Sequence, residues 1–329
     1  MKERITFLDT AKALAITLVI LGHCDAASVP YLPRIIWSFH MPLFFLISGM
    51  FLRPRPIGEA LRKYARAYLV PYFLVSLFGI GMVALAQPER FFDCVLGALW
   101  GSHLPARFLK LGYHVDGGPQ WFLFALFSGC MIFNFVSRIS DTFRRWLTTL
   151  AIAVLGIVIG RLHPLPFSIC HGAFASLYLM VGSEIKRYDL IEKFCALPKT
   201  MVGLVAVAWL ALVGFHDGVF DMRSMHSGGF STIVISVVAS MVVLSVVRKI
   251  PWDGGWMGRS TLAILCGHSL VLSYLLPICG RGALDFTSVR VVNFLIAFAI
   301  NFVGALLLAL ILQHLPIIGR FFCAAKKPK

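Results

Sequence analysis

Apolar residues in this chain gather in long runs that short polar segments separate. An apolar run of about 20 residues is long enough to cross a hydrocarbon core of ~30 Å as a helix, and such runs recur along the whole chain. The pattern therefore predicts an all-α integral membrane protein, a polytopic bundle of about ten transmembrane helices. The expected spans are 8–26, 35–52, 66–86, 121–137, 147–160, 166–185, 198–216, 229–247, 259–277 and 291–314.

Lysine and arginine residues set the expected orientation of these spans. If the N-terminus lies inside, 21 of the 30 Lys and Arg residues fall in inner segments and eight fall in outer ones. Cytoplasmic loops carry the excess of basic residues, so this alternation predicts an even number of spans with both termini cytoplasmic. The longest outer connection, 87–120, is expected to hold an amphipathic or re-entrant piece near 91–104. It is also the natural loop to contact an extracytoplasmic substrate.

The composition is that of a membrane protein, and it indicates which kinds of partner to expect. The chain of 329 residues is 59% hydrophobic and 14% charged, whereas soluble domains carry about 25% charged residues. A net charge of +15 could suggest nucleic acid, but the basic residues form no long basic face and do not alternate with aromatic residues. We therefore expect the lipid bilayer as a partner and no nucleic acid.

Domain organisation and cysteine usage add little further chemistry. No internal repeat or long linker divides the chain, so we expect a single transmembrane domain over 1–329 with no appended soluble domain. The eight cysteines are dispersed without a close pair at metal-ligand spacing, so we expect neither a metal site nor a disulfide framework. The pattern assigns no oligomeric state.

Three ionisable residues lie in the first apolar run. Asp9 and Lys12 are three residues apart and can touch on one helix face. His23 follows Lys12 by eleven residues, which is about 20° past whole turns and a rise of roughly 16 Å, so all three residues share one stripe. Buried ionisable residues are costly and indicate function, so we interpret His23 as a general base and Lys12 as a binder of an anionic group. An Asp9–Lys12 pair that reaches the inner interface and a merely hydrogen-bonded His23 are the structural alternatives.

The second apolar run adds a histidine at its outer end. If the first two spans form an antiparallel hairpin, His40 lies at the depth of His23, and the two make a candidate catalytic pair. Ser48 is a weaker candidate, because small residues such as Ser48 and Gly49 usually serve close helix packing. Other polar residues in or near spans are Arg161, His163, His171, Glu184, His268 and Asn301.

These residues lie within four longer stretches: LDTAKALAITLVILGH (8–23), FHMPLFFLISGMF (39–51), YLVPYF (68–73) and GPQWFLFALF (118–127). The stretches resemble acyltransferase family 3 of integral membrane proteins, and within it the branch of fucose 4-O-acetylases and other polysaccharide O-acetyltransferases. Family members typically show a basic residue, ten intervening residues and a histidine, and here Lys12 and His23 occupy those places. Many members have arginine there, so Lys12 is a departure that fits the fucose-acetylase-like branch. Beyond about residue 130 the resemblance rests on hydropathy alone.

The resemblance implies a reaction and its substrates. A family member moves an acyl group, usually acetyl, from cytoplasmic acetyl-CoA to a hydroxyl of a cell-envelope glycan or glycolipid, and lies in the inner (plasma) membrane. Acetyl-CoA is then the acyl donor, and no metal or prosthetic group is expected. Arg62, Lys63 and Arg66 could meet the phosphates of coenzyme A or could serve only as topology signals. Trp121 and His268, together with His40, are candidates to orient the substrates.

Two mechanisms and two other functions stay open at this point. His23 could deprotonate the acceptor hydroxyl for direct attack on the thioester, or it could carry the acyl group as a histidine intermediate. A multi-pass transporter or flippase of an envelope precursor could use the same buried charges as a substrate pathway, although the chain lacks convincing inverted repeats. A purely structural membrane protein would have little reason to place Asp9, Lys12 and His23 on one stripe.

Overall fold

The computed structural model describes residues 6–24, 29–101, 120–216, 220–224, 230–275 and 287–322, and every regular element in these ranges is a helix. The first half contains α1 (Thr6–Gly22), α2 (Leu32–Trp37), α3 (His40–Phe51), α4 (Ile57–Tyr64), the π-helix η2 (Ala65–Leu69), α5 (Val70–Ala86), η3 (Pro88–Arg90), α6 (Phe91–Trp100), α8 (Trp121–Val136) and α9 (Thr142–Leu162). The second half contains η5 (Pro166–Ser168), α10 (Ile169–Arg187), α11 (Leu190–Cys195), α12 (Lys199–Phe215), η6 (Met222–Ser224), α13 (Phe230–Val247), α14 (Gly255–Arg259), α15 (Thr261–Leu270), the π-helix η7 (Val271–Leu275), α17 (Arg290–His314) and η8 (Gly319–Phe321).

The helices include segments that suit a membrane. Five stretches are long and apolar enough to cross one: Leu32–Phe51, Ile57–Ala86, Thr142–Leu162, Phe230–Val247 and Arg290–His314. Helices also lie at the other five expected spans, and α6 lies where an amphipathic or re-entrant piece was expected. The prediction of an all-α fold is therefore confirmed for the described residues, and five of the predicted spans are long and apolar enough to cross a membrane. The count of about ten crossings and the cytoplasmic placement of both termini stay predictions.

The outer surface of the bundle is strongly apolar. Leu85 and Phe215 are 90% and 87% exposed, and Leu77 and Phe230 are 70% and 71% exposed. In water such side chains would be an aggregation hazard, whereas lipid tails solvate them as well as a protein core does. The exposed side chains of these helices therefore suit hydrocarbon surroundings.

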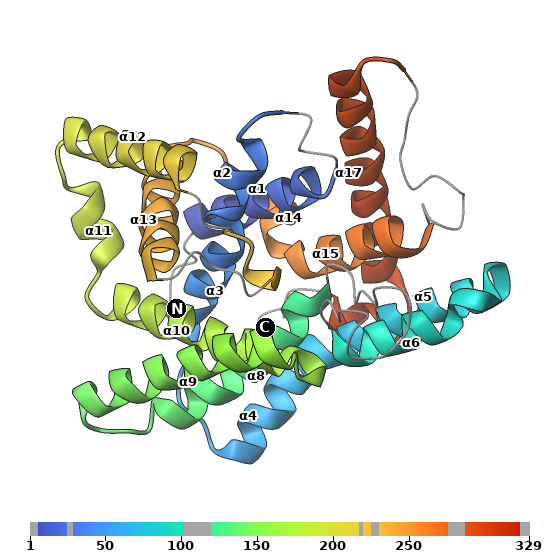
Figure 1. Cartoon of the computed structure of the whole chain (residues 1–329), viewed down its shortest axis with the longest axis horizontal. Coiled ribbons are helices and arrows are strands. Elements are labelled where there is room, and N and C mark those ends of the chain that lie inside the picture. The colour runs from blue at the N-terminus through green and yellow to red at the C-terminus, as the bar shows by residue number, and fades with distance from the viewer. Residues whose placement is uncertain are drawn as a thin grey trace.

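Close helix contacts build the centre of the bundle. α10 packs against α3, α8 and α9, and Figure 1 shows α8, α9 and α10 running along one side of the molecule. Gly49 of α3 faces the carbonyl oxygen of Leu179, and Gly182 of α10 faces that of Leu46; a Cβ at either glycine would lie 2.1 Å from the oxygen. Small residues let membrane helices approach this closely, so Gly49 is explained by packing.

The start of α1 is fixed by the segment that leads into α14. Thr10 Oγ1 donates to the carbonyl oxygen of Trp252 at 2.7 Å and accepts from the backbone N–H of Gly254 at 2.9 Å. Gly254 and Gly258 both face the backbone of α1 and leave no room for a side chain. This contact fixes the height and rotation of α1, and hence the places of Asp9 and Lys12.

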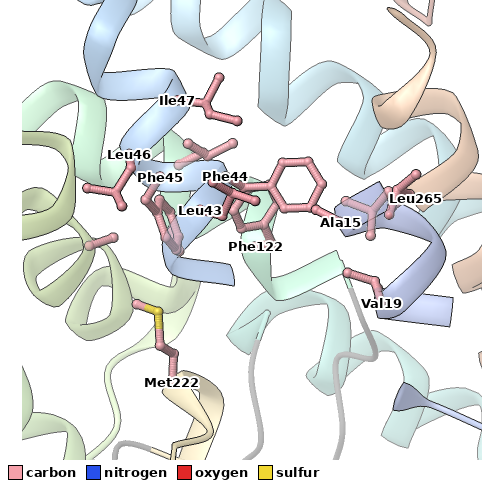
Figure 2. Close-up of a cluster of buried hydrophobic side chains, with 14 of the residues drawn as sticks. Ala15, Val19, Leu43, Phe44, Phe45, Leu46, Ile47, Phe122, Met222 and Leu265 are labelled. Carbon is pink, nitrogen blue, oxygen red and sulfur yellow. The ribbon is translucent and has the colours of Figure 1, made fainter. Parts of the chain in front are cut away.

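Aromatic packing joins α1, α3 and α8 between their polar residues. Phe122 of α8 lies 4.9 Å from Phe45 and 5.7 Å from Phe44, measured between ring centroids. Figure 2 shows Phe44 and Phe122 beside each other, with Ala15 and Val19 of α1 on one side. The cluster gives the polar groups of α1 and α3 a rigid, apolar frame.

Candidate active site

A cavity of about 320 Å³ lies between α1, α3, α8, α15 and the segment around η6. Its walls are mostly apolar, with a small number of polar side chains that converge on it. This is the usual character of a small-molecule site. The polar and aromatic residues that line it are Lys12, His23, Trp37, His40, Ser48, Tyr68, Trp121, Asp221, Arg223 and Thr261.

One end of the cavity is built around Lys12. Its ammonium lies 2.7 Å from the carboxylate of Asp9, which is buried, with 6% of its side chain exposed. Because α1 and α3 pack against each other and run in opposite directions, Ser48 near the end of α3 lies at the same end as Lys12. Tyr68 of η2 also lines the cavity. This end therefore presents one cation held in place by a buried carboxylate.

The opposite end carries two histidines. His23 follows the last residue of α1, and His40 begins α3. The two rings lie close enough to influence each other electrostatically. The Nδ1–H of His40 donates to the carbonyl oxygen of Ile36 at 2.7 Å, since a carbonyl can only accept. In the neutral ring, Nε2 of His40 therefore keeps a lone pair that can accept a proton or a hydroxyl hydrogen bond.

A break between α2 and α3 places His40. Ser38 and Phe39 separate the two helices, and Trp209 Nε1 of α12 donates to Ser38 Oγ at 3.0 Å. The ring of Phe39 packs edge-on against Trp209 at 5.6 Å. These contacts hold the break, so that the first residue of α3 turns its ring toward the cavity.

The segment before α13 supplies an arginine to the histidine end. Arg223 lines the cavity and is close enough to His23 to interact with it electrostatically. His171 of α10 holds this segment, because its Nε2–H donates to the carbonyl oxygen of Arg223 at 2.9 Å. The indole of Trp121 packs 5.2 Å from the ring of His171. This end thus gathers two imidazoles, a guanidinium and an aromatic platform.

The other predicted residues lie in two different places. His268 lies behind His23, with ring centroids 5.3 Å apart; it is fully buried and is not among the residues that line the cavity. Arg62, Lys63 and Arg66 are exposed on α4 and η2 outside the cavity. Tyr68, two residues after Arg66, does line the cavity. The structure thus unites Asp9, Lys12, His23, His40, Ser48 and Trp121 at one site.

The remaining polar candidates serve contacts elsewhere. Arg161 and His163 are exposed at the end of α9. Glu184 forms ion pairs with Arg145 at 3.7 Å and Arg187 at 3.8 Å. None of these residues lines the cavity.

Sequence reasoning missed Arg223, Tyr68 and Trp37 as cavity residues. Arg223 is one of the eight basic residues of the expected outer segments, and the connection that carries it is polar and shows no apolar periodicity, so nothing in the sequence marks it as a site residue. Tyr68 lies within the YLVPYF stretch, so the family resemblance was the one signal that could have identified it. Trp37 is one of seven tryptophans, and nothing in its local pattern separates it from the others.

Comparison with known proteins identifies the class. The family model for the acyltransferase domain of acyltransferase family 3 matches residues 5–314. The chain therefore belongs to this family and is a membrane acyltransferase. No curated protein and no solved structure matches the chain.

Proposed function

We propose that this protein transfers an acetyl group from cytoplasmic acetyl-CoA to a hydroxyl of a cell-envelope glycan or glycolipid, as an O-acetyltransferase of the inner membrane. The observation that carries the proposal is the cavity with Lys12 at one end and His23 and His40 at the other. A group-transfer enzyme that takes its two substrates from opposite sides of a membrane needs a site that both can reach. Within the family we place the protein in the fucose 4-O-acetylase-like branch, because its first helix has the Asp-x-x-Lys sequence at Asp9 and Lys12.

The Lys12 end suits the acyl donor. The cavity is too small for a whole coenzyme A, so only the acetyl-bearing end would enter it. The exposed cations Arg62, Lys63 and Arg66 would meet the phosphates outside, and Tyr68 lies next along the same stretch. Lys12 would then contact the pantetheine arm, with Asp9 fixing its ammonium, so that the thioester reaches toward the histidine end.

The histidine end suits a polar acceptor. Indole rings such as those of Trp37 and Trp121 offer the flat apolar faces on which sugar rings stack. His40 Nε2 can accept a hydrogen bond from one acceptor hydroxyl, while His23 contacts the hydroxyl that reacts. The acceptor would therefore be a sugar with neighbouring hydroxyls, presented from the face opposite the basic connections.

The proposed reaction is a direct transfer. A ring nitrogen of His23 takes the proton of the acceptor hydroxyl, whose oxygen attacks the thioester carbonyl carbon. Arg223 stabilises the negative charge on the tetrahedral oxygen. The carbon–sulfur bond then breaks, the coenzyme A thiolate leaves, and it takes the proton from His23. Each acetyl transferred thus produces one ester and one thiol.

The decisive test measures transfer of label from acetyl-CoA into envelope glycan. Membranes that contain wild-type protein, His23→Ala or the control His314→Ala are supplied with labelled acetyl-CoA at matched protein abundance. His314 is exposed at the end of α17, far along the chain from the cavity residues, so its loss should leave transfer unchanged. His23→Ala should lower transfer by about 10²-fold or more, the usual contribution of a general base.

The other outcomes distinguish the remaining hypotheses. Equal transfer by wild type and His23→Ala would show that the catalytic assignment is wrong. An acetyl group found on His23 after rapid quenching would replace direct attack by an acyl-histidine intermediate. A well-inserted wild type that transfers no label, yet moves an envelope precursor across vesicles, would favour the transporter function.

A further inference from the structure

A run of directed hydrogen bonds lies behind the histidine end of the cavity. The thiol of Cys24 donates to the carbonyl oxygen of Ile20 at 3.1 Å, so its sulfur is left to accept. Asn301 Nδ2 of α17 donates to that sulfur at 3.6 Å. The amide oxygen of Asn301 therefore points the other way, toward His268 of α15, whose Nδ1 lies 3.0 Å from it.

These directions determine which nitrogen of His268 carries the proton. An amide oxygen can only accept, so Nδ1 of His268 must donate. In the neutral ring the lone pair then lies on Nε2, and this atom is buried without a hydrogen-bond partner among the described residues. Buried polar atoms in native proteins are nearly always paired, so an orphaned one calls for a missing donor.

His23 is a neighbour of His268 that can supply the donor. The two ring centroids are 5.3 Å apart, with the ring planes inclined at 33°. Imidazole rings at this separation can be joined by an N–H···N hydrogen bond, so a ring N–H of His23 can serve as the donor to Nε2 of His268. His23 lines the cavity, whereas His268 is not among the residues that line it.

We infer that His268, fixed by Asn301 and Cys24, is a positioning residue that accepts a hydrogen bond from His23 and so keeps the other ring nitrogen of His23 unprotonated and turned toward the cavity. The inference rests on the proposed function only in its consequence for catalysis. A histidine with one N–H held by a neighbour is a single tautomer, and a general base needs that lone pair in a fixed place. The other ionisable groups that face His23 are His40 from α3 and Arg223 from η6.

The first measurement needs no substrate. The rate at which diethyl pyrocarbonate modifies His23 reports its exposed, unprotonated nitrogen, and mass spectrometry of the peptide isolates it from the other histidines. We expect His268→Phe, which keeps a ring but no nitrogen, to slow modification of His23 several-fold. His268→Gln, whose amide oxygen can occupy the place of Nε2, should restore at least half of the rate. The control His314→Phe should leave it unchanged.

The second measurement separates positioning from folding. His268→Phe should lower kcat for acetyl transfer by about 10- to 100-fold, a part of the roughly 10²- to 10⁴-fold that a positioned general base contributes, with little change in the KM for acetyl-CoA. The melting temperature of the purified protein is recorded for each variant. In a His23→Ala background, His268→Phe should reduce the residual activity no further, because the residue through which it acts is gone.

The outcomes judge the two proposals separately. The positioning role is overturned if diethyl pyrocarbonate modifies His23 in the His268→Phe variant at the wild-type rate. It is also overturned if modification is slower in His268→Phe and His268→Gln restores none of the lost rate. If wild type transfers no acetyl group while His268→Phe still slows modification of His23, the proposed function fails and the positioning role stands.

Discussion

Lys12 and Asp9 form an ion pair in which charge serves both folding and binding. The ammonium lies 2.7 Å from a carboxylate that is 94% enclosed, so Lys12→Met leaves a buried charge without its main counterion. We expect a loss of about 1–3 kcal/mol in stability and an increase of at least about tenfold in the KM for acetyl-CoA, the size of a lost charge-assisted contact. Thermal unfolding in detergent and steady-state kinetics measure the two effects.

The double variant Asp9→Asn with Lys12→Met separates the effect of Lys12 on stability from its effect on the KM for acetyl-CoA. It removes both charges, so the melting temperature should recover toward that of wild type while the KM stays high. Lys12→Arg, which is the residue of many family members, should retain most of the affinity. A double variant that regains a normal KM would show that Lys12 acts only as the partner of Asp9.

The residues of the first two helices could be placed from the sequence, and those from distant elements could not. Asp9, Lys12 and His23 share one stripe because helix geometry fixes it, and an antiparallel neighbour then brings His40 to the depth of His23. Arg223 reaches the same cavity from an irregular segment some 200 residues away along the chain. His268 was expected to face the substrates, but only tertiary packing could show that it lies behind His23.

At the scale of helices, the crossing of α3 and α10 depends on two glycines. A Cβ at Gly49 would lie 2.1 Å from the carbonyl oxygen of Leu179, and neither backbone can move without separating the helices. Gly49→Ala should therefore destabilise the protein by about 1–3 kcal/mol, the usual cost of overpacking. Because α3 carries His40 and Ser48, acetyl transfer should fall as well.

Gly81→Ala is the matched control for this crossing. Gly81 lies within α5, and a Cβ there would meet no other atom within 4 Å. Alanine is the better helix former, so this variant should be as stable as wild type or up to about 1 kcal/mol more stable. Equal melting temperatures for both alanine variants would show that the contact at Gly49 is not tight in the membrane.

Helices were easier to predict than their breaks. The apolar runs indicated a helix at each expected span, since length and hydropathy are local properties. The break at Ser38 and Phe39 divides what reads as one span, and it is held by Trp209 of α12, far away in sequence. Sequence alone could not show it, although the break is what places His40 beside the cavity.

At the scale of the whole molecule, distant basic connections meet at one face. A hydrogen bond or ion pair joins each of three pairs: Arg138 with the carbonyl of Arg55 at 2.5 Å, Arg145 with Glu184 at 3.7 Å, and Arg248 with Glu192 at 2.5 Å. Arg34, one of the eight basic residues of the expected outer segments, instead donates to the carbonyl oxygen of Gly214 at 3.3 Å. The gathering agrees with the alternation of charge along the chain, and the positive-inside rule leads us to expect that the face with Arg55, Arg145 and Arg248 is the cytoplasmic one.

The crossing that we choose to test is α10, because its 19 residues are long enough to span a membrane and yet it is not among the five stretches that are also apolar enough. Its buried face includes His171, whose ring packs against Trp121 of α8, and Ser176, whose hydroxyl donates to the carbonyl oxygen of Ala173. A helix that is surrounded by other helices can cross the membrane with modest hydropathy, since polar groups inside a bundle are paired with groups of the protein. We therefore expect Leu165, before α10, and Cys195, after it, to lie on opposite sides of the membrane.

A membrane-impermeant maleimide decides this in intact cells. In Leu165→Cys the new thiol replaces a side chain that is 39% exposed, and it should be labelled from outside. The native Cys195 lies on α11, next to Glu192 and the basic face, and should be labelled only after the cells are permeabilised. Mass spectrometry of each peptide separates the two thiols from the remaining cysteines, and Cys195→Ser is the control for the inner signal. Labelling of both thiols from outside would show that α10 does not cross the membrane. Every connection after α10 would then lie on the side opposite to the one expected. The residues of the basic face would be divided between the two sides of the membrane, which the positive-inside rule disfavours.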